Sequence, residues 1–280
     1  MPLVVTQPDR PAGRGRRLTP PAVKMAALEL EIPVYQPEAL RQPAAATPLR
    51  EAAPDLLVVV AYGEILRRNV LELAPHGALN VHPSLLPRYR GAAPVRAALL
   101  NGDIETGISI IRLVRKLDAG PVVRQEVVAI EPGEDAAALS ERLALLAAEM
   151  LPQTCLDWIS GTLEPLEQDE SQVTMTREWT RADARIAWDS RAERIERLVR
   201  ASQPWPVAWS NLDGEPFRIH AARVSDIELP AGLVRRSGKR VVAGCGEGAL
   251  ELVTVQPAGK RAMPAAGWWN GVRAEEVQLS

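Results

Sequence analysis

The strongest constraint on the fold is the order of three apolar runs and the helical patterns that accompany them. The runs cover residues 55–61, 77–82 and 106–112, and turn residues bound each of them. Apolar residues recur at helical spacing in residues 21–30 and 92–100. Continuous apolar runs are typical of strands buried in a parallel sheet. Their alternation with helices therefore predicts a doubly wound α/β domain with three parallel strands.

The rest of the sequence predicts a hairpin, a helix and a second domain. Residues 121–130 follow the third run after a short turn at 116–120, which is typical of a β-hairpin. A helix rich in Ala and Leu is expected from residue 134 to about residue 150. Beyond a polar linker at 160–180, short runs broken by Pro and Gly predict a small β-barrel.

Composition is that of a globular protein with two domains. The 280 residues are 46% hydrophobic, which can fill two cores, and we expect domains at 1–159 and 181–280. No apolar run reaches the roughly 18 to 20 residues of a membrane helix, and the first residues lack a signal peptide's charged start. Two distant cysteines and three histidines offer no zinc-ligand spacing. The expectation is a cytoplasmic monomer without a metal.

Charge is unevenly distributed although the formal net charge is only -2. Residues 181–280 hold 15 Lys and Arg against 12 Asp and Glu, whereas residues 1–180 hold 18 against 23. Basic charge is also concentrated in residues 7–17, where one aspartate accompanies four arginines, Arg10, Arg14, Arg16 and Arg17. Such a segment is typical either of a solvated loop or of a nucleic-acid contact.

Two polar side chains stand at the end of the second apolar run. Asn80 and His82 lie two residues apart, so a strand would present both on one face while Leu79 and Val81 point to the other. Prolines follow at positions 83 and 87 and end the strand pairing. The two polar groups are therefore expected at the carboxyl end of a strand, where open parallel sheets bind their ligands.

This pair of side chains suits the stabilisation of an oxyanion. An Asn amide donates to an oxygen, and His donates, accepts or carries charge near neutral pH. Asp118, in the turn after the next strand, is the best-placed carboxylate to hold the imidazole or relay a proton. The chain has no Gly-x-Ser-x-Gly elbow and no Cys beside a His, so the nucleophile is expected from a substrate. A purely structural His and a turn-capping Asp are the alternative.

Residues 80–94 and the later Leu117-Asp118-Ala119-Gly120 resemble the signature of enzymes that use 10-formyltetrahydrofolate. Within that superfamily, residues 6–18 resemble the acceptor-arm loop of the methionyl-tRNA formyltransferase family, and residues 202–206 and 255–263 resemble its second domain. The resemblance spans essentially the whole chain. It implies a Rossmann-like formyltransferase domain with a mostly parallel sheet, followed by an OB-fold-like β-barrel that contacts RNA phosphates.

The resemblance also implies the site residues. Asn80, His82 and Asp118 correspond to a catalytic trio, in which Asn80 and His82 stabilise the oxyanion while Asp118 orders water and favours a protonated His82. Two segments correspond to the binding site of 10-formyltetrahydrofolate: Val59, Val60, Ala61, Tyr62, Gly63, and Ser84, Leu85, Leu86, Pro87. The residues corresponding to contacts with initiator methionyl-tRNA are Arg10, Arg14, Arg16, Arg17, Lys260 and Arg261, with Arg14 entering the acceptor end.

Two other functions share parts of this pattern. A sugar-nucleotide formyltransferase or a formyltetrahydrofolate hydrolase has the same Asn-x-His and Asp residues, although the arginine segment favours an RNA substrate. A tRNA-binding protein without catalysis is the second alternative, because the family's first strand, Gly-Thr-Pro turn and following helix find no counterpart here. We therefore expect a gap in the sheet. Val114 and Lys116 also stand where the family usually has an acid and a glycine.

Overall fold

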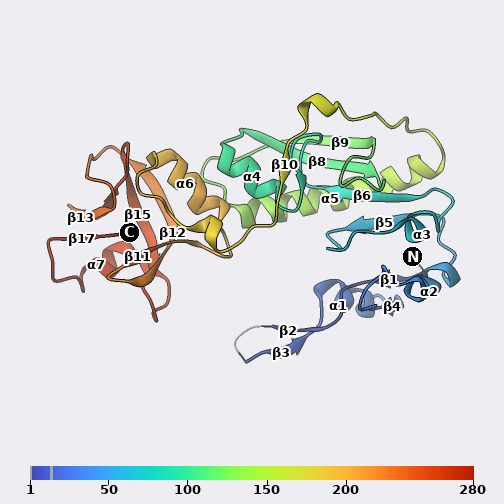
Figure 1. Ribbon diagram of the computed structural model, residues 1–280, viewed down its shortest axis with the longest axis horizontal. Helices are drawn as coiled ribbons and strands as arrows, with labels where there is room; N and C mark the ends of the chain where they lie inside the picture. The colour runs from blue at the N-terminus through green and yellow to red at the C-terminus, as the bar shows by residue number, and fades with distance from the viewer. Residues whose placement is uncertain (1, 13–14) are drawn as a thin grey trace. The chain divides into compact units, whose positions relative to one another are not determined.

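Figure 1 shows the computed structural model of the chain, which describes residues 2–12 and 15–280. The chain divides into two compact units. The first unit comprises Met1–Arg90, Ile108–Glu126 and Leu146–Val173, and the second comprises Gly91–Gly107, Val127–Leu145 and Thr174–Ser280. Strands and helices are interspersed along the chain as far as residue 159, which confirms the α/β class expected for this part.

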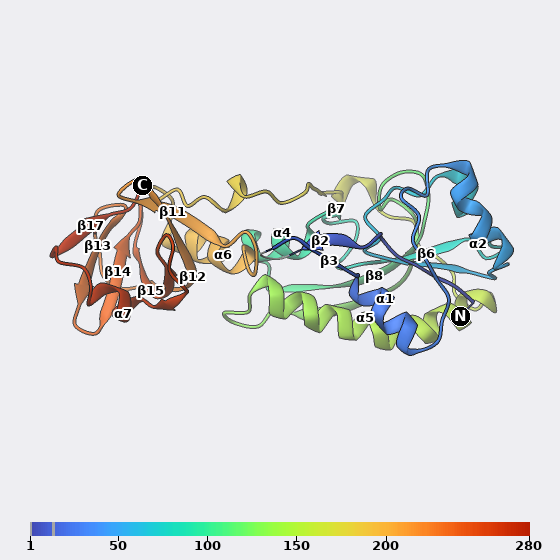
Figure 2. The same ribbon diagram turned by 90° about the horizontal axis from the view of Figure 1, so that it is seen from below.

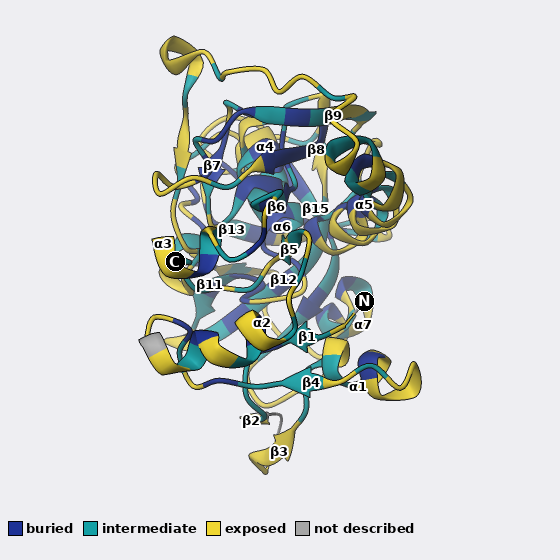
Figure 3. Cartoon of the chain, turned by 90° about the vertical axis from the view of Figure 1, so that its right-hand side faces the viewer, coloured by how far each residue is buried: buried dark blue, intermediate teal, exposed yellow. Residues whose placement is uncertain are grey.

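The central sheet has the order β5-β6-β8-β9. Its strands are β5 (Leu57–Val60), β6 (Ala78–His82), β8 (Glu105–Arg112) and β9 (Val122–Ala129). The pairing of β5 with β6 is parallel, as predicted. The direction predicted for the third apolar run is wrong, because β8 lies antiparallel to β6. Six consecutive residues of β8 are buried (Figure 3), and a continuous apolar run reports burial on both faces but not strand direction.

A second, two-stranded sheet pairs β1 (Val4–Val5) with β4 (Val34–Tyr35) in parallel. No hydrogen-bonded strand joins it to β5 within residues 2–12 and 15–280, which agrees with the gap expected in the sheet. Val58 and Val60 of β5 are 44% and 56% exposed. A small core nevertheless connects the two sheets, because Val5 and Leu57 both pack against Leu49 and its buried neighbours.

Helices and short strands complete the amino-terminal part. They are β2 (Arg10–Ala12), β3 (Arg17–Thr19), α1 (Ala22–Glu29), η1 (Pro43–Ala46), α2 (Thr47–Glu51), α3 (Arg68–Leu71) and β7 (Arg90–Gly91). The β2 and β3 strands pair antiparallel, so the arginine segment forms a hairpin. No helix of the described residues is both long and apolar enough to cross a membrane.

The long helix α5 (Ala136–Ile159) does not end near residue 150 as predicted (Figure 2). It continues past Pro152, which lacks a backbone donor and normally breaks a helix. Tertiary contacts compensate, because Thr154 is fully buried and the Trp158 Nε1 donates to the His76 carbonyl at 3.0 Å. A polar segment follows, with η2 (Glu170–Gln172), β10 (Met175–Thr176) and η3 (Ala182–Ala184).

The predicted carboxy-terminal barrel is a curled antiparallel sheet of seven strands. They are β11 (Ala208–Leu212), β12 (Glu215–Ser225), β13 (Leu233–Ser237), β14 (Arg240–Gly244), β15 (Ala249–Gln256), β16 (Met263–Pro264) and β17 (Glu276–Gln278). Asn211 and Ser280 exchange backbone hydrogen bonds of 2.8 and 3.0 Å, which links the first strand to the end of the chain. The sheet thereby encloses its own core.

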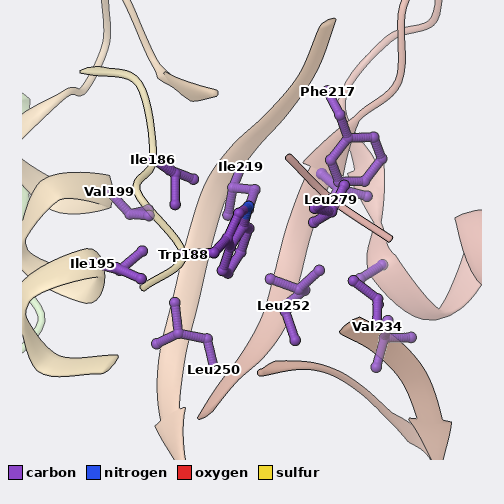
Figure 4. Packing of buried hydrophobic residues seen from close by; sticks show 14 of the residues in the cluster. Ile186, Trp188, Ile195, Val199, Phe217, Ile219, Val234, Leu250, Leu252 and Leu279 are labelled. Carbon is purple, nitrogen blue, oxygen red and sulfur yellow. The ribbon is translucent and has the colours of Figure 1, made fainter. Parts of the chain in front are cut away.

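Three α-helices lie wholly within the described part of the second unit: α4 (Pro94–Asn101), α6 (Ala192–Ala201) and α7 (Ala265–Trp269). Ile195 and Val199 of α6 pack into the core of the curled sheet beside Ile219 and Leu250 (Figure 4). The spacing of four residues puts these two side chains on one helical face. The α4 helix ends at Gly102, whose φ of 73° is the left-handed conformation that favours glycine at a helix end.

Candidate active site

Asn80 and His82 lie on β6 between β5 and β8, as the sequence predicts. Leu79 and Val81 point to the opposite face of the strand and are buried. Asn80 is half-buried, and its carboxamide makes no hydrogen bond with any residue that the structure describes. A carboxamide held on a paired strand and not engaged by the protein is available to a ligand.

His82 is 4% exposed and has a defined partner on each side of its ring. Its Nε2 lies 2.8 Å from the Tyr89 carbonyl oxygen, and its Nδ1 lies 3.6 Å from Oδ2 of Asp118. Because a carbonyl only accepts, Nε2 carries a hydrogen and donates it to Tyr89. Nδ1 faces the carboxylate at a distance longer than a direct hydrogen bond. Nδ1 is therefore the ring nitrogen that can act together with Asp118 on a ligand.

The loop that carries Asp118 has an unusual backbone. Asp118 has a φ of 47°, in the left-handed region, and its residue is 9% exposed. Asp is one of the few residues with a side chain that adopts this conformation readily. A Cβ on Gly120 would lie 1.7 Å from the Arg112 carbonyl oxygen, so the close return of the chain requires glycine there.

Gln168 holds this loop in place. Its Nε2 donates to the carbonyl oxygens of Asp118 at 2.8 Å and of Gly120 at 2.7 Å. Its Oε1 accepts from Nε of Arg90 at 2.9 Å. Gln168 is not among the predicted site residues, because it lies 50 residues from Asp118 in a segment predicted to be only a linker. No local sequence signal could have identified it.

Arg90 and Glu170 extend this contact. Arg90 is 1% exposed, and its Nη2 lies 2.9 Å from Oε1 of Glu170. The other Glu170 oxygen accepts from Nζ of Lys116 at 2.6 Å. Hydrogen bonds from Lys116 and Arg90 lower the pKa of the Glu170 carboxyl. Lys116 thus ties the Asp118 loop to the same carboxylate that Arg90 binds.

Ser109, on β8, holds the segment 84–87 that follows β6. Its hydroxyl donates to the Ser84 carbonyl at 2.6 Å and accepts from the Leu86 amide at 3.1 Å and from Nε2 of Gln125 at 2.7 Å. Gln125 also donates to the Leu86 carbonyl at 3.1 Å. Ser109 is completely buried and lies opposite His82 in the strand register. These contacts fix the chain that immediately follows the catalytic candidates.

The predicted folate residues after β6 differ in what they can offer. The Ser84 hydroxyl donates to the Arg88 carbonyl at 2.7 Å, so it is engaged within the protein. Both polar backbone groups of Leu86 are engaged by Ser109 and Gln125. Leu85 and Pro87 are partly exposed. A ligand would therefore meet apolar surface in this segment, and the folate assignment of these residues stays a prediction.

The other predicted folate segment begins in β5 with Val59 and Val60 and continues through a bend. Ala61 and Gly63 have φ values of 47° and 81°. The Tyr62 carbonyl accepts from Nε2 of Gln7 at 3.0 Å. The Tyr62 hydroxyl is buried without a hydrogen-bond partner among the described residues, and burial raises the pKa of Tyr62 to about 12. Its ring packs in the core, so contact with a ligand would rely on the backbone, and the folate assignment of this segment stays a prediction.

The predicted RNA contacts are exposed. Arg10, Arg16 and Arg17 lie on the hairpin of β2 and β3, whereas Arg14 lies outside the described residues. Asp9 does not neutralise them, because its carboxylate binds Nζ of Lys24 at 2.8 Å and Nε2 of Gln36 at 2.8 Å. The last two predicted contacts, Lys260 and Arg261, are exposed in the turn between β15 and β16. Their role in binding RNA stays a prediction.

Comparison with known families decides the class of the protein. The profile described as "Formyl transferase" matches residues 1–155, and that described as "Formyl transferase, C-terminal domain" matches residues 179–273. The methionyl-tRNA formyltransferase of Roseiflexus castenholzii is 48% identical over 273 residues, covering 96% of this chain and 87% of that protein. The chain belongs to the methionyl-tRNA formyltransferase family.

Further relatives support the same family. The methionyl-tRNA formyltransferase of Chloroflexus aurantiacus is 45% identical over 280 residues, covering 99% of this chain and 90% of that protein. Among solved structures, HypX from Aquifex aeolicus in complex with tetrahydrofolic acid is similar with a TM-score of 0.64, 18% identity, and coverage of 87% of this chain and 43% of that one. At this identity the similarity shows the fold. A formyltransferase is thus the enzyme class of this family.

No group of three or more His, Cys, Asp and Glu side chains within the described residues could hold a metal ion. The cysteines Cys155 and Cys245 are unpaired thiols, and burial raises the pKa of both. The candidate site therefore consists of Asn80, His82 and Asp118, held by Gln168 on one side and Ser109 on the other.

Proposed function

We propose that this chain transfers the formyl group of 10-formyltetrahydrofolate to the α-amino group of methionine esterified to initiator tRNA. The observation that carries the proposal is the buried pair of His82 and Asp118, with 3.6 Å between Nδ1 and Oδ2. His82 lies on β6, the strand that also presents Asn80. Identity of 43 to 48% to proteins named methionyl-tRNA formyltransferase supports this substrate pair.

Asn80 acts on the formyl oxygen. When the amine attacks the formyl carbon, a C–N bond forms and negative charge develops on that oxygen. The Asn80 amide, which has no partner in the described part of the chain, donates a hydrogen bond to it. Removal of one such donor costs on the order of 100-fold to 1000-fold in rate.

His82 and Asp118 transfer the proton that the reaction moves from the amine to the folate nitrogen. The attacking amine loses a proton, and the folate nitrogen gains one when its bond to the formyl carbon breaks, so the exchange leaves no net change. With Nε2 donating to Tyr89, Nδ1 of His82 and the carboxylate of Asp118 are the pair through which this proton passes. The left-handed backbone at Asp118 and the two hydrogen bonds from Gln168 keep the carboxylate in position.

The exposed arginines supply the RNA contact. Arg10, Arg16 and Arg17 of the hairpin and Lys260 and Arg261 of the second unit contact phosphates and the frayed acceptor end. Arginine suits this role because its planar guanidinium binds phosphate through two donors. Monomeric state, cytoplasmic location and domain boundaries at 159 and 180 remain predictions alongside this proposal.

The test is a transfer assay with the purified chain, 10-formyltetrahydrofolate and charged initiator methionyl-tRNA. The proposal predicts formylmethionyl-tRNA and tetrahydrofolate in equal amounts. Uncharged initiator tRNA and methionyl elongator tRNA serve as the controls, and neither should match the initiator substrate.

Three other results would contradict the proposal, and each would indicate a different function. Transfer to an amino-sugar nucleotide and not to tRNA would indicate a sugar formyltransferase. Release of formate without an acceptor would indicate a hydrolase. Tight tRNA binding without tetrahydrofolate release would indicate a non-catalytic tRNA-binding protein.

A further inference from the structure

A pocket of about 480 Å³ lies in the second unit. It is bounded by α4, by residues 175–190 and by α6. The volume lies within the range of small-molecule sites. None of the predicted catalytic, folate or tRNA residues lines it.

Positive charge predominates on the walls. Three arginines, Arg177, Arg185 and Arg194, line the pocket, and Asp183 is its single carboxylate. That carboxylate is already engaged, because it binds both terminal nitrogens of Arg177 and accepts from the Thr180 hydroxyl at 2.6 Å. These hydrogen bonds place the pKa of Asp183 well below its usual range. Asp183 therefore offers nothing to the two remaining guanidinium groups.

Arg185 and Arg194 are exposed and have no ion pair among the residues the structure describes. The Arg185 guanidinium lies 5.6 Å from the ring centroid of Trp209. It therefore contacts an aromatic ring, with no carboxylate partner among the described residues. The Arg194 side chain makes no hydrogen bond within the same described residues. Two guanidinium groups at one pocket are thus available to an anion.

Another arginine, Arg96, lies against the Trp179 ring that lines the pocket. Trp179 lines the pocket, and the guanidinium of Arg96 lies 5.7 Å from its ring centroid. Arg96 donates to the Ala201 carbonyl at 3.2 Å and has no carboxylate partner in the described chain. Desolvation by burial lowers the pKa of Arg96. Four guanidinium groups therefore face or flank this pocket against one carboxylate.

We propose that this pocket binds a phosphate group of the tRNA backbone, with Arg194 and Arg185 as its ligands. Arginine and phosphate form charge-assisted, frequently bidentate hydrogen bonds, which suits two unpaired guanidinium groups at one opening. The adjacent Trp179 ring gives the attached nucleoside an apolar surface. The identity of the RNA rests on the proposed function, whereas the phosphate chemistry rests on the pocket alone.

The test compares Arg194→Gln with Arg191→Gln in the full chain. Arg191 is a matched control, because it lies three residues away and is also exposed but pairs with Glu247 at 3.1 Å. Affinity for uncharged initiator tRNA is measured over a series of salt concentrations. Loss of one phosphate contact should lower the slope of log affinity against log salt by about 0.7 to 0.9. Arg194→Gln should show this change and Arg191→Gln should not.

A second measurement separates the sources of phosphate and guards against misfolding. Inorganic phosphate and a mononucleotide are titrated into the unmodified protein and into Arg194→Gln, and thermal melting confirms that the variant folds. Competition of these ligands with tRNA, lost in Arg194→Gln, supports the proposal. Binding of inorganic phosphate that depends on Arg194, with an unchanged tRNA slope, would overturn the RNA assignment.

An equal slope in both variants without any phosphate binding would overturn the site altogether. Because uncharged tRNA binding requires no chemistry, these outcomes are distinct from failure of the proposed function. A chain that bound tRNA through Arg194 but formed no formylmethionyl-tRNA would refute the reaction and leave the pocket proposal standing.

Discussion

Two regions of the molecule differ in how firmly their polar side chains are held. In the fixed region, beside the candidate site, each supporting side chain is buried or partly buried and makes at least two hydrogen bonds; these are Gln168, Arg90 and Ser109. In the exposed region, the hairpin of β2 and β3, the described arginines are exposed. Among the described hairpin arginines, the one side-chain hydrogen bond is that of Arg10 to Gln7, at 3.4 Å. The difference fits two tasks. Catalysis requires donors fixed before the substrate arrives, because reorganisation during the reaction raises the barrier. Phosphate binding requires cations that can exchange water for phosphate oxygens.

The largest effect is expected at the fixed region. Asn80→Ala should lower the turnover number by about 100-fold to 1000-fold, because the formyl oxygen loses a positioned donor. Affinity for tRNA should not change. Steady-state formylation and filter binding measure the two quantities, and Asn69→Ala, at an exposed position of α3, is the control. Equal turnover in Asn80→Ala and the control would remove Asn80 from the mechanism.

The next largest effect tests whether the position of Asp118 depends on Gln168, which lies in the polar segment 160–180. Gln168→Ala removes two hydrogen bonds to the Asp118 loop and one from Arg90. Two loop bonds at about 0.5 to 1.5 kcal/mol each amount to about 1 to 3 kcal/mol, so turnover should fall by about 5-fold to 160-fold. A positioning role also predicts a changed pH profile of the rate.

Gln172→Ala is the control for this variant, since its side chain bonds only to Asp169 in the same segment. A merely structural role would lower the melting temperature of Gln168→Ala without a change in the pH profile. That outcome would contradict the claim that Gln168 positions Asp118.

A smaller effect is expected in the exposed region, and on a different quantity. Arg17→Gln should remove one phosphate contact. The slope of log affinity for tRNA against log salt concentration should therefore become less steep by about 0.7 to 0.9. Turnover at saturating tRNA should be unchanged. Arg68→Gln is the control, because this exposed arginine already pairs with Glu72 at 2.7 Å. A fall in turnover at saturating tRNA would show that the two regions are not separate in function.

The smallest effect concerns stability in acid. Hydrogen bonds from Lys116 and Arg90 lower the folded-state pKa of Glu170 below its ordinary value of 4.5. The stabilisation is therefore fully present above pH 4.5 and is lost as pH falls through the lower folded-state pKa. Glu170→Gln should weaken the loss of melting temperature on acidification through this window. Melting curves at successive pH values test this, and an identical acid dependence in both proteins would contradict it.

The sequence predicts the parts of the site that depend on local periodicity. The i, i+2 spacing of Asn80 and His82 places them on one face of β6, and the apolar runs locate β5, β6 and β8. The direction of β8 was not predictable in this way, because burial on both faces produces the same pattern in either orientation. The length of α5 was underestimated because buried contacts beyond Pro152 outweigh a local helix-breaking signal.

The supporting residues were not predictable from local patterns at all. Gln168 and Ser109 contact carbonyl and amide groups 23 to 50 residues away along the chain. Gln and Ser occur throughout protein surfaces, so their identity alone carries no signal for such a role. The fold brings them to the site, and the resemblance to a family identifies the catalytic candidates but not what holds them.

The most direct test of the central claim, that His82 and Asp118 act as one catalytic unit, is a double-mutant cycle. Single-turnover rates of formyl transfer are measured for His82→Gln, Asp118→Asn and the double variant, each confirmed as folded by thermal melting. Residues that act as a unit have strongly non-additive effects. If His82 and Asp118 act as one unit, the double variant should be no slower than the slower single variant. Rate losses that multiply in the double variant would contradict it.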